Sequence, residues 1–131
     1  MIRKRISSGS PFEESIGFSR ALRSGNRILV SGTAPILEDG SAAFPGDAYR
    51  QTLRCLEIID KAILKAGGTL ADVIRTRVYL SDKDTWQEVG RAHGEYFGKI
   101  RPCSTFVEVS ALIDPGWMVE IEAECELSDN E

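Results

Sequence analysis

The sequence predicts an α/β fold, a two-layer sandwich in which two helices cover one face of a mixed sheet. Three observations predict it: one segment alternates apolar and acidic residues, two segments space apolar residues as helices do, and the segments follow the order β-β-α-β-α-β-β. A chain of 131 residues fits one domain, and no linker, repeat or low-complexity segment divides it. We therefore expect a single domain over residues 1–131.

The first two predicted strands form a β-hairpin. Residues 18–22 and 27–32 are strand-like, and residues 24–26 between them, Ser-Gly-Asn, mark a turn because Gly and Asn adopt positive φ readily. The basic run at residues 3–5 is interpreted as a short additional strand with a solvated edge.

Two segments have apolar residues spaced three and four apart, as on one face of a helix. The first is expected to begin after Asp47, a good N-cap residue, and to end before Gly67. The second is expected over residues 85–97, capped by Ser81 or Asp82. The side chains expected to face inward are Tyr49, Leu53, Leu56, Ile59 and Ile63 in the first helix, and Trp86, Val89, His93 and Tyr96 or Phe97 in the second.

Three further strands are expected at residues 73–80, 104–109 and 119–127. In the last one, five apolar residues alternate with four glutamates, which indicates one face packed on a core. The glutamates on the other face lie about 7 Å apart along the strand, so they must be solvated or paired, and Arg75 and Arg77 are candidate partners. In the strand at 73–80, the residues expected to face the core are Ile74, Thr76, Val78 and Leu80.

Composition excludes several classes of function. The net charge is −4 and no basic stripe is present, which argues against a nucleic-acid partner. No run of about 18 apolar residues and no secretory signal occurs, so we expect no membrane association. The three cysteines form no C-x-x-C pair, which favours reduced, mostly buried thiols in the cytoplasm. No metal-ligand spacing or phosphate loop is present, and we expect no metal and no cofactor.

Four segments resemble signatures of the RidA (YjgF) family, also described as L-PSP endoribonuclease-like. Residues 30–35 resemble its V-S-G-Q-x-P, and residues 64–74 resemble L-x-x-A-G-x-x-x-x-D-V. Residues 78–82 match V-Y-L-x-D, and residues 119–123 match V-E-I-E-A. The resemblance covers nearly the whole chain. It implies a chorismate-mutase-like fold and a homotrimer that binds a small-molecule metabolite in clefts between subunits.

The resemblance also implies site residues. Members of the deaminase type hydrolyse enamines and imines, such as 2-aminoacrylate, to keto acids and ammonia. By position, Ser31 and Glu120 match the family's catalytic serine and glutamate, and Gly32 follows that serine. Phe18 replaces a tyrosine, and Phe106 stands where deaminases usually carry Cys or Ala.

The largest departure lies at Ser104, which stands where the family has an arginine. A serine cannot reproduce a cationic fork that binds a carboxylate through two hydrogen bonds. The favoured hypothesis is therefore a member that binds a less anionic or more apolar metabolite and lacks the standard 2-aminoacrylate deaminase activity. The alternative is an enamine/imine deaminase, a hydrolase, in which Arg101 or Arg20 supplies the cation. RNA cleavage or translation inhibition is a third hypothesis, which the acidic charge opposes.

Overall fold

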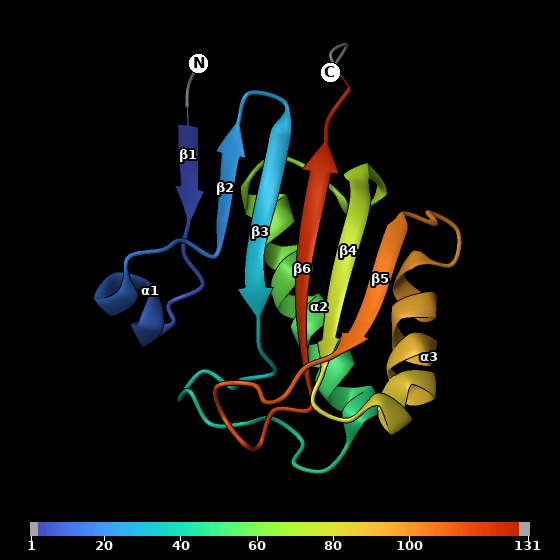
Figure 1. Ribbon diagram of the computed structural model, residues 1–131. Helices are drawn as coiled ribbons and strands as arrows, with labels where there is room; N and C mark the ends of the chain where they lie inside the picture. Colours follow the sequence, from blue (N-terminus) through green and yellow to red (C-terminus); the bar gives the residue numbers. More distant parts are fainter. Residues whose placement is uncertain (1–2, 129–131) are drawn as a thin grey trace.

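A computed structural model describes residues 3–128, which form one six-stranded sheet backed on one face by two helices (Figure 1). The strand order is β1-β2-β3-β6-β4-β5. Only β4 and β5 pair in parallel, so the predicted mixed sheet and two-layer sandwich are confirmed. The strands are β1 (Arg3–Ile6), β2 (Ala21–Ser24), β3 (Arg27–Thr33), β4 (Val73–Leu80), β5 (Cys103–Glu108) and β6 (Val119–Glu126). The α-helices are α1 (Pro11–Ile16), α2 (Ala48–Lys65) and α3 (Trp86–Phe97), and short 3-10 turns span Leu70–Asp72 and Lys83–Thr85.

Helix α2 packs its buried face against β3 and β6 and supplies much of the core. Asp47 caps it as predicted, because its carboxylate accepts a hydrogen bond from the Arg50 backbone N–H. Leu56, Ile59 and Ile63 are fully buried, whereas Tyr49 and Leu53 are only half-buried. No helix within residues 3–128 combines the length and apolar character that crossing a bilayer requires.

The prediction that Trp86 faces the core is wrong. Its side chain is 57% exposed, while Val89 and Phe97 on the same helix are buried as expected. Trp86 begins α3, and Figure 1 shows that this first turn lies beyond the ends of β4 and β5, where no strand is available to cover it.

The start of β4 also differs from the prediction, because the residue that faces the core there is not the predicted one. Val73 is buried and Ile74 is 43% exposed, because the pairing of β4 with β6 is irregular between Val73 and Arg75. A bulge of this kind adds one residue and reverses the alternation on one side of it. Beyond it, Thr76, Val78 and Leu80 face the core as predicted.

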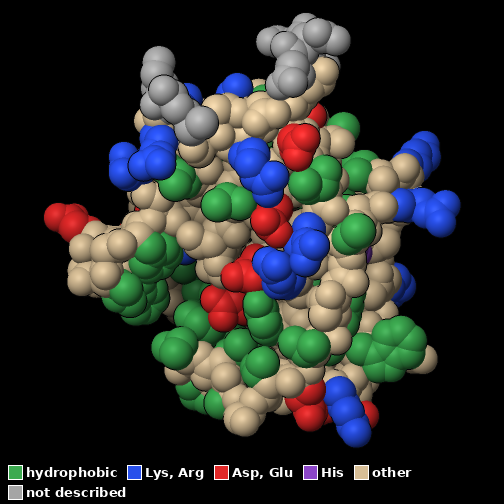
Figure 2. All heavy atoms as spheres, turned by 45° about the horizontal axis from the view of Figure 1, so that its top comes forward, with side chains coloured by type: hydrophobic (Ala, Val, Ile, Leu, Met, Phe, Trp, Pro, Cys, Tyr) green, Lys and Arg blue, Asp and Glu red, His purple; other side chains and the backbone are tan. Residues whose placement is uncertain are grey.

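Three of the four glutamates of β6, Glu122, Glu124 and Glu126, are paired with arginines on the open face of the sheet, and Arg75 and Arg77 are among the partners as predicted. Arg77 Nη1 lies 3.7 Å from Glu122 Oε1 and 3.4 Å from Glu124 Oε2, and Arg75 Nε lies 3.5 Å from Glu124 Oε2. Arg27 on β3 adds a contact of 3.5 Å with Glu124. Figure 2 shows these basic and acidic side chains crossing the middle of this face, with hydrophobic side chains beside them.

The predicted hairpin is present but shorter. Strand β2 begins at Ala21, so residues 18–20 connect it to a helix, α1, that the predicted order lacked. The signals for α1 are local: Ser10 accepts a hydrogen bond as N-cap, Pro11 takes the first helical position, and Gly17 ends the helix with φ 95°.

Cys55 and Cys125 are buried as expected, but Cys103 is exposed at the edge strand.

Gln51 is a fully buried polar residue that joins two loops to α2. Its Nε2 donates to the carbonyl of Ala43 at 3.0 Å and to that of Gly116 at 2.9 Å, and its Oε1 accepts from the Met118 backbone N–H at 2.8 Å. The amide thereby satisfies three backbone groups that the loops leave unpaired. These two loops form one side of the cavity described below.

Replacing Gln51 with methionine, which has a similar volume, tests this role. The Gln51→Met variant leaves the three backbone groups unpaired, and we expect the free energy of unfolding to fall by roughly 3 kcal/mol or more. Urea denaturation measures it, with Gln87→Met on the exposed side of α3 as the matched control. A loss no larger than that of the control would contradict the assigned role.

Candidate functional site

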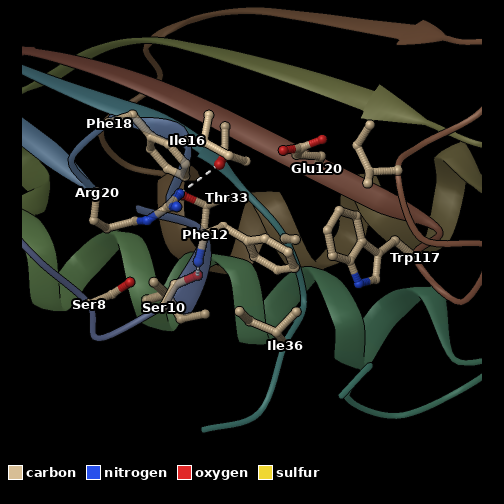
Figure 3. A pocket seen from close by; sticks show the side chains of 14 residues that line it. Ser8, Ser10, Phe12, Ile16, Phe18, Arg20, Thr33, Ile36, Trp117 and Glu120 are labelled. Atoms are coloured by element: carbon tan, nitrogen blue, oxygen red, sulfur yellow. Dashed lines mark hydrogen bonds between the residues drawn. The ribbon is translucent and has the colours of Figure 1, made fainter. Parts of the chain in front are cut away.

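A cavity of about 150 Å³ opens between α1, the end of β3 and the start of β6 (Figure 3). Most of its wall is apolar, and the charged groups Arg20 and Glu120 meet it on the side of the sheet. Such a wall suits a ligand with an apolar body and few polar groups. The larger apolar side chains of the wall are Phe12, Ile16, Phe18, Ile36, Ile58, Ile113 and Trp117.

Arg20 is buried, with only 6% of its surface exposed, and it ties the segment after α1 to the end of β3. Its Nη1 donates to the Gly32 carbonyl at 2.6 Å and to Thr33 Oγ1 at 2.9 Å. Its guanidinium carbon lies 5.3 Å from the centre of the Phe18 ring. Burial lowers the pKa of Arg20, and the carboxylates of Glu13 and Glu120 oppose that change, so the guanidinium stays a cation.

Glu13 on α1 is the buried counter-ion of Arg20, with its Oε2 3.9 Å from Arg20 Nε. It also accepts hydrogen bonds from the hydroxyl of Ser8 at 2.6 Å and from the backbone N–H of Ser8 at 3.2 Å. Burial alone would raise the pKa of Glu13, but hydrogen bonds from Ser8 and Ser7 and the charge of Arg20 lower it overall. The ionised carboxylate therefore anchors α1 over the cavity.

Glu120 extends from the outer face of β6, and its carboxylate lies against the backbone of Gly32. A Cβ at Gly32 would come 2.8 Å from Glu120 Oε2, so only glycine leaves room for this close approach. Burial raises the pKa of Glu120, Arg20 opposes the change, and Glu122 adds to it. A carboxyl group with a raised pKa can hold or release a proton closer to neutral pH, as a general acid or base must.

The structure brings together four of the residues named from the sequence. Phe18, Gly32 and Glu120 line the cavity, and so does Arg20, one of the two arginines considered as the replacement cation. Ser31 does not, because its hydroxyl donates to the Ser19 carbonyl at 2.6 Å and so holds the segment that carries Phe18. Its contribution within one chain is to position that segment.

The other predicted residues lie apart from this cavity. Ser104 and Phe106 are on β5 and Arg101 precedes it, and β4 separates that strand from β6. Arg101 is exposed, with φ 56°, and its backbone N–H bonds the Phe97 carbonyl at the end of α3. Within a single chain, neither Ser104 nor Arg101 reaches Glu120.

His93 packs as predicted, between helix and sheet. Its ring centre lies 4.8 Å from that of Phe97 and 5.5 Å from that of Phe106.

Among residues 3–128, no group of three or more potential ligand side chains could hold a metal ion.

The sequence did not predict Glu13, the counter-ion of Arg20, or Trp117 in the cavity wall. Glu13 lies in helix α1, which was not predicted, and the signals for that helix were the Ser-Pro start and the closing Gly17. Trp117 precedes β6 at a position that continues the buried side of its alternation, and this signal could have been extended to it. Its indole N–H is buried and has no hydrogen-bond partner within the described residues.

Comparison with known proteins finds relatives over almost the whole chain. The family model described as Endoribonuclease L-PSP matches residues 10–126. An uncharacterized protein of Streptomyces coelicolor is 40% identical over 121 residues, which cover 92% of this chain and 90% of that protein. The 3-aminoacrylate deaminase RutC of Acinetobacter baylyi is 34% identical over 101 residues, which cover 77% of this chain and 79% of that protein.

A solved structure is similarly close. A member of the YjgF/YER057c/UK114 family from Mycobacterium tuberculosis superposes with a TM-score of 0.86 at 48% identity. The match covers 96% of this chain and 100% of that one. The architecture and much of the sequence are therefore shared with a protein of known structure.

Replacing Gly32 with alanine, which adds one methyl group, tests the contact between Gly32 and Glu120. In Gly32→Ala the carboxylate must move away, and because burial raises its pKa, we expect the pKa of Glu120 to fall toward its ordinary value. NMR titration of the Glu120 side-chain carboxyl measures it. Gly90→Ala, where an added Cβ meets open space, is the matched control. An unchanged Glu120 pKa in Gly32→Ala would show that this contact does not hold the carboxylate in place.

Proposed function

The chain belongs to the endoribonuclease L-PSP family, the RidA or YjgF family, and from this premise we propose that it binds a small metabolite in the cavity at Arg20 and Glu120. The binding form is a homotrimer in which a neighbouring subunit completes each cavity. The observation that carries the proposal is an otherwise apolar cavity in which a buried cation and a carboxyl group with a raised pKa meet on one side.

The cavity limits the size and character of the ligand. A volume of about 150 Å³ is of the order that admits a molecule such as benzene. The aromatic and aliphatic walls favour an apolar body, and Arg20 and Glu120 favour one polar group that can accept and donate hydrogen bonds. This chemistry agrees with the loss of the family arginine at Ser104, which removes a binding point for a second negative charge.

The rim of the cavity supports a homotrimer. Ile16 and Ile113 both line the cavity, yet their side chains are 70% and 87% exposed in the single chain. Large apolar side chains gathered around an opening mark a surface that another molecule covers. A neighbouring subunit would cover these residues, and the residues on β5 that lie far from Glu120 within one chain would then serve the cavity of the neighbour.

A second candidate function is enamine or imine deamination, and the position of Arg20 favours it. Arg20 is a cation in the same cavity as Glu120, and a relative 34% identical to this chain is named 3-aminoacrylate deaminase. In this reaction the enamine carbon first takes a proton, which gives an iminium ion. Water then adds to the C=N carbon, oriented by Glu120, and ammonia leaves as the carbonyl forms. Arg20 would bind the substrate carboxylate through Nη2, because Nη1 is already bonded to Gly32 and Thr33.

RNA cleavage has no comparable support. The arginines of the open sheet face, Arg27, Arg75 and Arg77, are all paired with glutamates of β6. A phosphate backbone would have to displace these carboxylates, which face the same surface.

The proposed assembly predicts that a charge at the rim dissociates the subunits. Sedimentation velocity of the wild type should give three times the chain mass of 14.4 kDa, and Ile113→Glu should shift the protein to smaller species. Ile113 is exposed in the single chain, so the substitution does not disturb the core. Leu64→Glu, exposed on α2, is the matched control and should remain trimeric. A monomeric wild type, or a trimeric Ile113→Glu, would refute the proposed arrangement.

Binding itself can be followed with benzyl alcohol, which has an apolar ring and one hydroxyl. We expect its addition to shift the NMR signal of the Trp117 indole until the cavity saturates, while the exposed Trp86 indole on α3 stays unchanged as an internal control. Ala34→Phe fills the cavity and should abolish the shift. Equal shifts of the two indoles would mean that the cavity is not the binding site.

The deaminase candidate is tested by ammonia release from freshly generated 2-aminoacrylate and 3-aminoacrylate. If Arg20 binds the carboxylate through Nη2, Arg20→Met lowers the rate by about 10- to 150-fold, the loss expected for one hydrogen bond between charged groups. Arg101→Met is measured beside it, and Arg50→Met, at an exposed position on α2, is the control. Circular dichroism verifies that each variant is folded. A wild-type rate equal to buffer, or full activity in both Arg20→Met and Arg101→Met, rules out this candidate.

A further inference from the structure

Three hydrogen-bonding side chains form a continuous chain from the helix layer to the exposed edge of the sheet. His93 Nε2 on α3 lies 2.8 Å from Thr76 Oγ1 on β4. The same Thr76 oxygen lies 2.7 Å from Ser104 Oγ on β5. Thr76 is fully buried, His93 is half-buried, and Ser104 is exposed, so the chain ends at a hydroxyl that a ligand can reach.

The imidazole of His93 is enclosed by aromatic rings, with Phe97 on one side and Phe106 on another. Burial lowers the pKa of His93, so the ring is neutral at neutral pH. Charged side chains on the surrounding elements have other partners. On the sheet, Arg75 and Arg77 pair with Glu122 and Glu124, and Glu108 accepts a hydrogen bond from the Lys83 backbone N–H. On the helices, Glu57 pairs with Arg54, Glu95 accepts from the Tyr49 hydroxyl, Arg91 lies over the Tyr49 ring, and the charge of Asp60 acts on Tyr96.

The donor and acceptor roles along this chain are linked, because the Thr76 hydroxyl has one proton. When His93 Nε2 accepts, Thr76 donates to it and accepts from Ser104, which leaves the Ser104 oxygen facing outward as an acceptor. When His93 Nε2 carries a proton, it donates to Thr76. The buried Thr76 O–H then satisfies its own proton by donating to Ser104, and the Ser104 O–H points outward as a donor. A neutral His93 permits both arrangements through its two tautomers, whereas a protonated His93 permits only the second.

We propose that His93, acting through Thr76, sets the direction of the Ser104 hydroxyl, and that Ser104 is thereby a binding point for one uncharged polar group of the ligand. That group is a carbonyl or ether oxygen when His93 is protonated, and an N–H or O–H when His93 Nε2 accepts. His93 and Thr76 are positioning residues in this arrangement, and Ser104 alone touches the ligand. This position requires no negative charge on the ligand, unlike the arginine that it replaces.

The placement of Ser104 at a neighbour's cavity rests on the proposed homotrimer. The coupling of the three side chains does not, because all three belong to one chain. Thermodynamic linkage then requires a reciprocal effect: if protonation of His93 favours an acceptor at Ser104, an acceptor bound there raises the pKa of His93 by the same free energy.

Two uncharged five-membered rings of similar size can distinguish a Ser104 hydroxyl that donates outward from one that accepts. Cyclopentanone offers only an acceptor and pyrrole offers only an N–H donor. We expect the affinity for cyclopentanone to rise, and that for pyrrole to fall, as the pH decreases through the pKa of His93, each by about 2- to 12-fold, the effect of one hydrogen bond. NMR titrations of the Thr105 amide measure both affinities between about pH 4.5 and pH 7.5, and the ¹⁵N signals of His93 report its tautomer and pKa.

Thr76→Val interrupts the chain while keeping the volume and the apolar contacts of the side chain. In this variant the opposite pH dependences of the two probes should disappear, although Glu120 still titrates, so an effect of Glu120 is separated from that of His93. Ser104→Ala should remove the difference between the probes at every pH. Sedimentation velocity on the same samples reports the trimer independently, so failure of the assembly is distinguished from failure of the coupling.

An unaltered pH dependence in Thr76→Val overturns the proposal. So does a His93 pKa that cyclopentanone leaves unchanged while it binds at Ser104. Absence of binding of either probe at the Ser104 edge in a trimeric sample also overturns it, because the hydroxyl would then not be a ligand contact.

Discussion

The buried guanidinium of Arg20 is the interaction on which the candidate site depends. It binds the end of β3 through the Gly32 carbonyl and Thr33, it balances Glu13 on α1, and its field reaches Glu120 on β6. A cation removed from water must be paired and hydrogen-bonded, so its burial determines the positions of its partners. The helix, the strand end and the carboxyl group are therefore held together by one desolvated charge.

The site residues are divided between two parts of the sheet. Glu120 and Gly32 lie on central strands, whereas Ser104 and Phe106 lie on the edge strand β5, with β4 between them. Ser104 pairs with Thr76, whose side chain faces the core, whereas Glu120 pairs with Tyr79 on the open face. The Ser104 and Glu120 side chains of one chain therefore lie on opposite faces of the sheet. The division agrees with a site shared between copies of the chain, and it separates an ionic region at Arg20 from an uncharged, hydroxyl-bearing region at Ser104.

Much of the fold follows from local patterns. The alternation in β6, the capping of α2 by Asp47 and the pairing of Arg75 and Arg77 with the glutamates were all predicted from spacing alone. The two burial predictions that were wrong share one cause: each depended on where the residue lies relative to the rest of the sheet. Trp86 has the correct helical spacing but lies beyond the sheet, and Ile74 has the correct alternation but precedes a bulge.

The sequence by itself determined the family, the mixed sheet with its two covering helices, and the residues Phe18, Gly32 and Glu120 of the cavity, because these depend on periodicity and on short motifs. The resemblance to the family implies that Ser104 stands at the position of a family arginine. Only the tertiary structure decided that Arg20 lies beside Glu120 while Arg101 does not, and that Ser104 is connected to His93 through Thr76. These relations join residues 17 to 100 positions apart in the chain, and no local pattern encodes them because they arise from the order in which the strands pair.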